Sequence, residues 1–285
     1  MKKLKQIITR VKTDPPSDPN EFTELLWQLI CYSPKMSVRL QQQQLLDEAE
    51  KFSLKVSDDY FAKQELKFNG FKWGNGNRKV LITHGWGSKA ADFTELIAAL
   101  REIDDLQIIA FDAPGNGSSE GELSNLLLFI LAVKAIVSAY GTPDIWIGHS
   151  LGGMANVMAV KEIGISPPLM ISLTPLIRLK ENFEASMNAA DVPQIAQGKF
   201  LADFEHKFGK PASYYNLIDW YPTNVPFKHW LAHDRHDLVS TYDYMEEFLN
   251  SNPSIISQEH EGVGHERIIK SEAVINDIVT LIKAG

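Results

Sequence analysis

Residues 145–153 read Ile-Trp-Ile-Gly-His-Ser-Leu-Gly-Gly, and this stretch decides the fold. Its apolar start predicts a buried strand, and the apolar-periodic residues 151–162 predict a helix that follows at once. Between them the pattern G-x-S-x-G places Ser150 on a sharp turn, where Gly148 and Gly152 remove side chains that would collide. The helix would point its N-terminal amides at any negative oxygen formed there. Ser150 is therefore the candidate nucleophile.

A second motif, residues 80–87, reads Val-Leu-Ile-Thr-His-Gly-Trp-Gly and ends another apolar run. A loop that leaves a buried strand in this way can supply a backbone N–H to a developing oxyanion. We expect the amides of Trp86 and Leu151 to bind the substrate oxygen together. His84 is interpreted as a brace for the loop and not as a proton-transfer group.

Apolar runs alternate with amphipathic segments from residue 65 onward, which predicts an α/β fold with a mostly parallel central sheet flanked by helices. The predicted strands are residues 65–69 and 71–73, paired through a turn at Asn69-Gly70, then 80–84, 106–111, 144–148, 169–173, 226–232 and 254–259. The predicted helices are residues 93–103, 123–138, 151–162, 242–249 and 272–283.

Two segments depart from this alternation. Residues 1–62 have helical spacing of apolar residues over 21–31 and 37–52, so we expect a helical N-terminal segment packed on the core. Residues 176–225 are helical and aromatic, which predicts a cap inserted above the carboxyl edge of the sheet. The core would then comprise residues 63–175 and 226–285, with residues 37–52 packed beside the cap and shielding the site.

Residues 112–121 read Asp-Ala-Pro-Gly-Asn-Gly-Ser-Ser-Glu-Gly. Together with the two motifs above, this chain resembles the α/β-hydrolase superfamily, whose loop here reads D-x-P-G-H-G-x-S-x-G. Asn116 stands at the position usually held by histidine, so a role assigned to that histidine does not transfer.

The resemblance implies the α/β-hydrolase fold with a helical cap, and a catalytic acid after the strand predicted at 226–232. Asp237 matches the final Asp of the family segment, and Asp234 is the reserve. The sequence Gly-Val-Gly-His at 262–265 matches the family's histidine segment and makes His265 the general base. The chain order Ser150, Asp237, His265 is the order of this fold.

Composition narrows the classes of partner. The net charge of −8, with acidic and basic residues interspersed, argues against a nucleic-acid partner. A single cysteine, no apolar signal-peptide region and no run of about 18 apolar residues favour a cytoplasmic chain without a membrane partner. No metal-binding spacing lies on one helix and no nucleotide motif is complete, so we expect no metal and no cofactor.

The chemistry that these residues favour is that of a serine hydrolase with a small-molecule substrate. The primary hypothesis is a carboxylic ester hydrolase that acts through an acyl-enzyme on a small or medium, partly apolar ester. Acyl transfer, peptide cleavage and lyase chemistry on the same fold remain alternatives. A non-catalytic ligand-binding member of the fold is the alternative from another class. Such a member usually lacks a triad residue or an oxyanion glycine, and this chain lacks neither.

Overall fold

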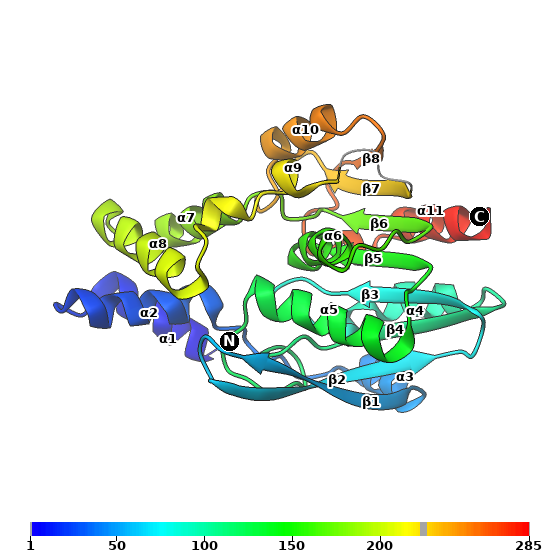
Figure 1. The fold of residues 1–285 in the computed structure, drawn as a ribbon, viewed down its shortest axis with the longest axis horizontal. Helices are drawn as coiled ribbons and strands as arrows, with labels where there is room; N and C mark the ends of the chain where they lie inside the picture. The colour runs from blue at the N-terminus through cyan, green and yellow to red at the C-terminus, as the bar shows by residue number, and fades with distance from the viewer. Residues whose placement is uncertain (1, 223–226, 285) are drawn as a thin grey trace.

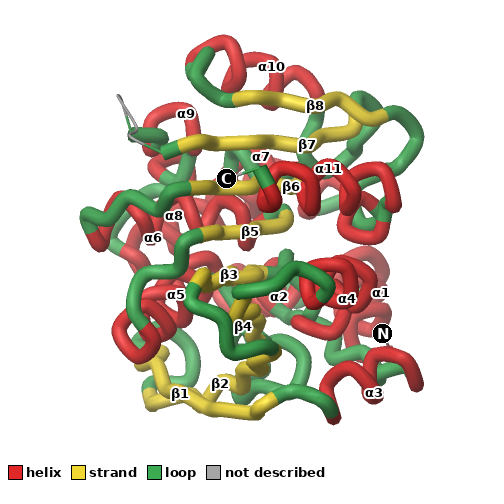
Figure 2. The backbone as a smooth tube through the Cα atoms, turned by 90° about the vertical axis from the view of Figure 1, so that its right-hand side faces the viewer, coloured by secondary structure: helices red, strands yellow, loops and turns green. Residues whose placement is uncertain are grey.

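The computed structural model describes residues 2–222 and 227–284. Its eight strands form one sheet in the order β1-β2-β4-β3-β5-β6-β7-β8, in which β2 alone runs against the other seven (Figures 1 and 2). The strands are β1 (Glu50–Asp58), β2 (Gln64–Trp73), β3 (Arg78–Thr83), β4 (Leu106–Phe111), β5 (Ile145–His149), β6 (Leu169–Leu173), β7 (Lys228–Asp234) and β8 (Ile256–His260).

Helices cover both faces of the sheet. On one face lie α5, α6, α9 and α10, and on the other lie α3, α4 and α11. The helices α1, α2, α7 and α8 lie beyond the carboxyl ends of the parallel strands (Figure 1). The helices are α1 (Lys2–Thr13), α2 (Pro19–Cys31), α3 (Leu40–Asp47), α4 (Thr94–Arg101), α5 (Leu126–Tyr140), α6 (Leu151–Ile163), α7 (Leu179–Ala189), α8 (Gln194–Phe208), α9 (Leu217–Trp220), α10 (Tyr242–Ser251) and α11 (Glu272–Lys283), with 3₁₀ turns η1 (Ala90–Phe93), η2 (Ala212–Tyr214) and η3 (Ile268–Lys270).

The central strands bury apolar side chains on both faces, as the sequence predicts. Leu81 and Trp146 point into the core shared with α5 and α6, whereas Val80, Ile82 and Ile147 point into the core shared with α4 and α11. Because side chains alternate along a strand, a continuous apolar run supplies both cores at once. This confirms the predicted α/β fold with its mostly parallel sheet.

The hairpin predicted at Asn69-Gly70 is wrong, because β2 continues through both residues and pairs with β1 on one side and β4 on the other. Gly70 lies opposite Phe52 on β1, and a β-carbon on Gly70 would lie 2.0 Å from the tip of that ring. The absence of a side chain at Gly70 therefore leaves room for the Phe52 ring, and the residue is not part of a turn.

Residues 37–52 are also not the single helix that we predicted. The helix α3 is shorter, and β1 begins at Glu50. α3 packs against η1 and α4, so the prediction that this stretch lies beside the cap is wrong. The last predicted strand is correctly located but not buried on both faces, because β8 is an edge strand whose Ile256 is 51% exposed.

The helices α7 and α8, here called the cap helices, lie between β6 and β7 in the chain and beyond the carboxyl ends of the parallel strands (Figure 1). It is α2 that packs on them. The Trp27 ring lies 4.6 Å from Phe200 and 5.9 Å from Phe204, centroid to centroid, and its Nε1 donates to Asp203 Oδ2 over 2.7 Å. The predicted boundary between residues 225 and 226 lies outside the described residues.

Candidate active site

Ser150 occupies the turn between β5 and α6 with φ 52° and ψ −121°, a conformation that costs a residue with a side chain about 1–3 kcal/mol. The turn is held because the Ser150 amide donates to the Leu173 carbonyl over 3.0 Å. A β-carbon on Gly152 would lie 2.3 Å from the His84 carbonyl oxygen, and one on Gly148 would lie 2.6 Å from the Gly153 Cα. The glycines of the motif thus allow the backbone approaches that the sequence predicts.

The structure brings Ser150, His265 and Asp237 into one hydrogen-bonded chain. His265 Nδ1 donates to Asp237 Oδ2 over 2.6 Å, and Ser150 Oγ donates to His265 Nε2 over 2.8 Å. Since a carboxylate can only accept, the Asp237 contact places the imidazole proton on Nδ1 and leaves Nε2 free to accept. The Asp237 side chain is 0% exposed, and its Oδ1 accepts the amides of Val239 (2.7 Å) and Ser240 (3.0 Å).

Asp234, the reserve acid, has a different position. Its Oδ1 accepts the His236 amide over 2.8 Å and its Oδ2 accepts the Gly264 amide over 2.7 Å. Asp234 therefore holds the loop that carries His265 without touching the imidazole. Backbone hydrogen bonds lower the pKa of Asp234 against the opposing effect of burial, so the group is held as a carboxylate.

The two predicted oxyanion donors lie beside Ser150 at the point where the strand order reverses. β3 and β5 are paired neighbours, with Thr83 opposite Gly148, so the loops that follow them meet at one edge. Trp86 and Leu151 line the same cavity as Ser150. Within residues 2–222 and 227–284, neither of their amides has a hydrogen-bond acceptor, which leaves both free to bind an oxygen.

His84 lies buried in the loop, as the sequence predicts for a brace. Its Nδ1 donates to the Gly85 carbonyl over 2.6 Å, and its Nε2 accepts the Ala113 amide over 2.9 Å. Burial is the main cause that lowers the pKa of His84, which keeps the ring neutral and suited to this pair of bonds.

Asn116 has a role that the sequence did not assign. Its Oδ1 accepts the Gly87 amide over 3.1 Å and the Ser33 hydroxyl over 2.5 Å, while its Nδ2 donates to the Ser124 hydroxyl over 2.9 Å. Asn116 thus ties the loop after β3 to the N-terminal segment. Its position in the glycine-rich motif is the signal that could have pointed to it.

His149 is a second residue that the sequence reasoning missed. Its Nε2 donates to the His265 backbone carbonyl over 2.8 Å, so it holds the histidine loop against the serine turn. Burial, aided by repulsion from His265, lowers the pKa of His149 to about 3. The ring is therefore neutral at ordinary pH, and its Nδ1 is buried without a partner among the described residues.

The remaining histidines near the acid do not join this site. His260 Nε2 lies 3.9 Å from Asp277 Oδ2, and His236 pairs with Glu261 on the surface. Across the described part of the chain, no group of three or more His, Cys, Asp or Glu side chains could hold a metal ion.

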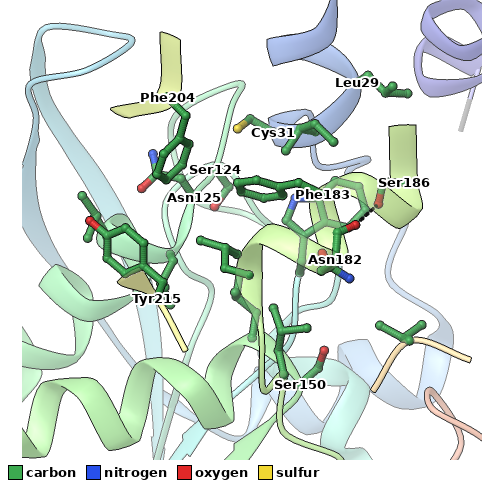
Figure 3. Close-up of a pocket in the computed structure, with 18 of the residues that line it drawn as sticks. Leu29, Cys31, Ser124, Asn125, Ser150, Asn182, Phe183, Ser186, Phe204 and Tyr215 are labelled. Atoms are coloured by element: carbon green, nitrogen blue, oxygen red, sulfur yellow. Dashed lines mark hydrogen bonds between the residues drawn. The ribbon is translucent and has the colours of Figure 1, made fainter. Parts of the chain in front are cut away.

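A cavity of about 310 Å³ opens above Ser150 and has mostly apolar walls (Figure 3). Its apolar lining includes Leu126, Leu176, Phe183, Phe204 and Tyr215. Such a volume and lining are typical of a small-molecule site, where a few polar groups fix the orientation. Here the polar groups include Ser150 and His265.

Comparison with known proteins identifies the family of the chain. Residues 80–269 match the model of the Alpha/beta hydrolase family, which is well over half of the chain. The chain belongs to this family. Monoglyceride lipase of Rattus norvegicus is 30% identical over 112 residues, 36% of this chain and 37% of the lipase. Pimeloyl-[acyl-carrier protein] methyl ester esterase of Xylella fastidiosa is 29% identical over 125 residues, 44% of this chain and 47% of the esterase. The chain thus spans less than half the length of these curated relatives.

Solved structures place the whole fold in the same class. The Pyrococcus furiosus esterase Pf2001 superposes with a TM-score of 0.63 and 18% identity, over 88% of this chain and 98% of that one. The mouse alpha/beta hydrolase domain-containing protein 10 gives a TM-score of 0.62 and 16% identity, over 82% and 97%. At these identities the likeness shows the fold alone.

This α/β hydrolase builds part of its cavity from outside the matched segment. Leu29, Ile30 and Cys31 of α2 line the cavity, although the family model begins at residue 80. No helix within residues 2–222 and 227–284 is long and apolar enough to cross a bilayer.

Proposed function

We propose that the protein is a serine carboxylesterase in which Ser150 is the nucleophile, His265 the general base and Asp237 the acid that orients it. The observation that carries the proposal is the hydrogen-bonded chain from Ser150 through His265 to Asp237, at 2.8 and 2.6 Å, opening onto a largely apolar cavity. A nucleophile within reach of a base that a third group orients is the diagnostic arrangement for covalent catalysis.

In the first step the Ser150 oxygen attacks the carbonyl carbon of the ester while its proton moves to His265 Nε2. The carbonyl oxygen gains the negative charge and accepts hydrogen bonds from the Trp86 and Leu151 amides. Each such donor contributes about 3–4 kcal/mol to lowering the barrier in other hydrolases. His265 then gives its proton to the departing alkoxide, and an acyl-Ser150 ester remains. Asp237 stabilises the imidazolium throughout.

Deacylation repeats the sequence with water. His265 Nε2 takes a proton from the water molecule, whose oxygen attacks the acyl carbon. Collapse of the second oxyanion releases a carboxylic acid and returns the proton to Ser150. The turnover therefore consumes one water and needs no cofactor.

Three features support an ester of modest size with an apolar part. The cavity volume of about 310 Å³ lies at the small end of the range that is typical of small-molecule sites. Its walls are largely aliphatic and aromatic. Two relatives named a lipase and a methyl ester esterase match the chain.

The one cysteine, Cys31, is a free thiol, which supports our proposal of a cytoplasmic location where thiols stay reduced.

A fluorophosphonate probe, run beside a series of p-nitrophenyl esters and the Ser150→Ala variant, tests the proposal. We expect labelling of the wild type, loss of labelling in the variant, and turnover of short or medium esters. Labelling without turnover of any ester would keep the nucleophile but move the reaction to acyl transfer or peptide cleavage. A protein that is folded yet unlabelled between about pH 6 and 9 would overturn the enzyme proposal in favour of a binding protein.

A further inference from the structure

The end of α2 is fixed to the core by a short set of contacts. The Ser124 amide donates to the Cys31 carbonyl over 2.8 Å, and Tyr32 forms an isolated bridge with Leu123. One residue further on, the Ser33 hydroxyl donates to Asn116 Oδ1. These bonds fix the backbone at Cys31, so a larger side chain there could not be relieved by a shift of the helix end.

The other half of α2 is fixed to the cap helices. Trp27 is buried against Phe200 and Phe204 and is hydrogen-bonded to Asp203, all on α8. The wall that α2 gives to the cavity is therefore held from both sides. A wall of this kind selects by size, because close-packed side chains cannot make room without strain.

Figure 3 shows how the cavity runs. Ser150 lies at one end, Cys31 and Leu29 lie at the opposite end, and Phe183 lies between them. The side chains of Cys31 and Leu29, both on α2, are buried and line the cavity. A chain attached to the carbonyl carbon at Ser150 would pass Phe183 and meet α2.

We propose that Cys31 and Leu29 close the far end of the acyl-binding cavity and set the longest acyl chain that the enzyme accepts. The inference rests on the proposed esterase function, which it deepens. The family model does not cover α2, so this specificity would come from a segment outside the matched hydrolase core.

The test compares kcat/KM for p-nitrophenyl esters with acyl chains of 2 to about 12 carbons. We expect Cys31→Phe to lower kcat/KM for the longest good substrate by about tenfold or more, while acetate hydrolysis changes less than about twofold, because one misplaced methylene costs 10–200-fold. Cys31→Ala should move the optimum toward longer chains. Gln28→Phe adds the same ring to the exposed side of α2 and is the matched control. The same profile in wild type and both Cys31 variants would overturn the proposal, as would a shift in the control.

Should Cys31→Phe fail to fold, Cys31→Ala and a chemical measurement decide the matter. Ethyl and decyl fluorophosphonates both react so that a Ser150 Oγ–P bond forms and fluoride leaves with the hydroxyl proton. Labelling by each probe can be followed by mass in the wild type and in Cys31→Ala. We expect Cys31→Ala to raise the rate of labelling by the decyl probe, relative to the rate with the ethyl probe, by about threefold or more, and an unchanged ratio of the two rates would refute the assignment. No adduct at all would instead refute Ser150 as the nucleophile, so the two failures are distinguishable.

Discussion

Replacing Asp237 with asparagine should lower kcat by about 10⁴-fold while leaving the fold intact. In the wild type, Asp237 Oδ1 accepts the amides of Val239 and Ser240, and Oδ2 accepts His265 Nδ1–H. In the variant only the amide oxygen can still accept the two N–H groups, so the new NH₂ faces the imidazole. His265 must then accept at Nδ1 and carry its proton on Nε2, where it cannot take the proton of Ser150. The same tautomer reversal in a serine protease costs about 10⁴ in kcat, or about 5 kcal/mol.

The assay is kcat on a short p-nitrophenyl ester, with the thermal midpoint measured on the same samples. Asp234→Asn is the matched comparison, because both Asp234 oxygens accept backbone amides and neither touches His265. An asparagine there turns one N–H donor toward another, so we expect lower stability and a much smaller loss of kcat in the folded protein. If Asp237→Asn keeps kcat within tenfold of wild type, or if Asp234→Asn loses more, the assignment of the acid is wrong.

Three further predictions follow from contacts around the site. His149→Phe removes the donor to the His265 carbonyl and should lower kcat about tenfold or more with little change in KM, and His149→Gln should restore part of it; equal kcat in all three proteins would contradict this role. Gly152→Ala puts a β-carbon 2.3 Å from the His84 carbonyl oxygen and should lower both the melting temperature and the activity. A variant with the melting temperature of the wild type would show that the backbone of the turn can shift to fit the methyl group. Burial lowers the pKa of both His149 and His229 to about 3 in the folded state from 6.5. As pH drops below 6.5, the unfolded chain takes up protons before the folded protein does. The free energy of unfolding should therefore fall, by about 2 kcal/mol per histidine at pH 5. In His229→Gln the free energy of unfolding, measured by urea titration at each pH, should depend less steeply on pH.

The parts of the site that could be predicted from sequence share one property. Ser150, Asp237 and His265 each lie within a few residues of a strand end, where the family segments that the sequence resembles identified Asp237 and His265. The parallel sheet then brings the strand ends to one edge, which is why residues separated by more than a hundred positions meet within hydrogen-bond distance.

Residues that act through distant partners could not be found in this way. Nothing near His149 in the sequence indicates that it binds the His265 carbonyl, and nothing near Asn116 indicates Ser33. The missed strand β1 is a different kind of error, because Phe52, Leu54 and Val56 alternate with polar residues at the period of a strand. A helical interpretation extended to residue 52 ran across that alternation.

The contacts of Asn116 also decide how the N-terminal segment can be tested. Its Oδ1 is shared between the Ser33 hydroxyl, which anchors the end of α2, and the Gly87 amide, which neighbours the predicted oxyanion donor Trp86. Deleting the N-terminal segment would therefore remove one wall of the cavity. It would also remove the Ser33 hydrogen bond to Asn116 Oδ1, the atom that holds the loop after β3. Such a deletion should lower activity on every ester, including acetate, and would hide an effect on chain length. Substitution at Cys31 leaves Ser33 and its bond in place, so a change confined to long chains would separate selection by α2 from support of the catalytic loop.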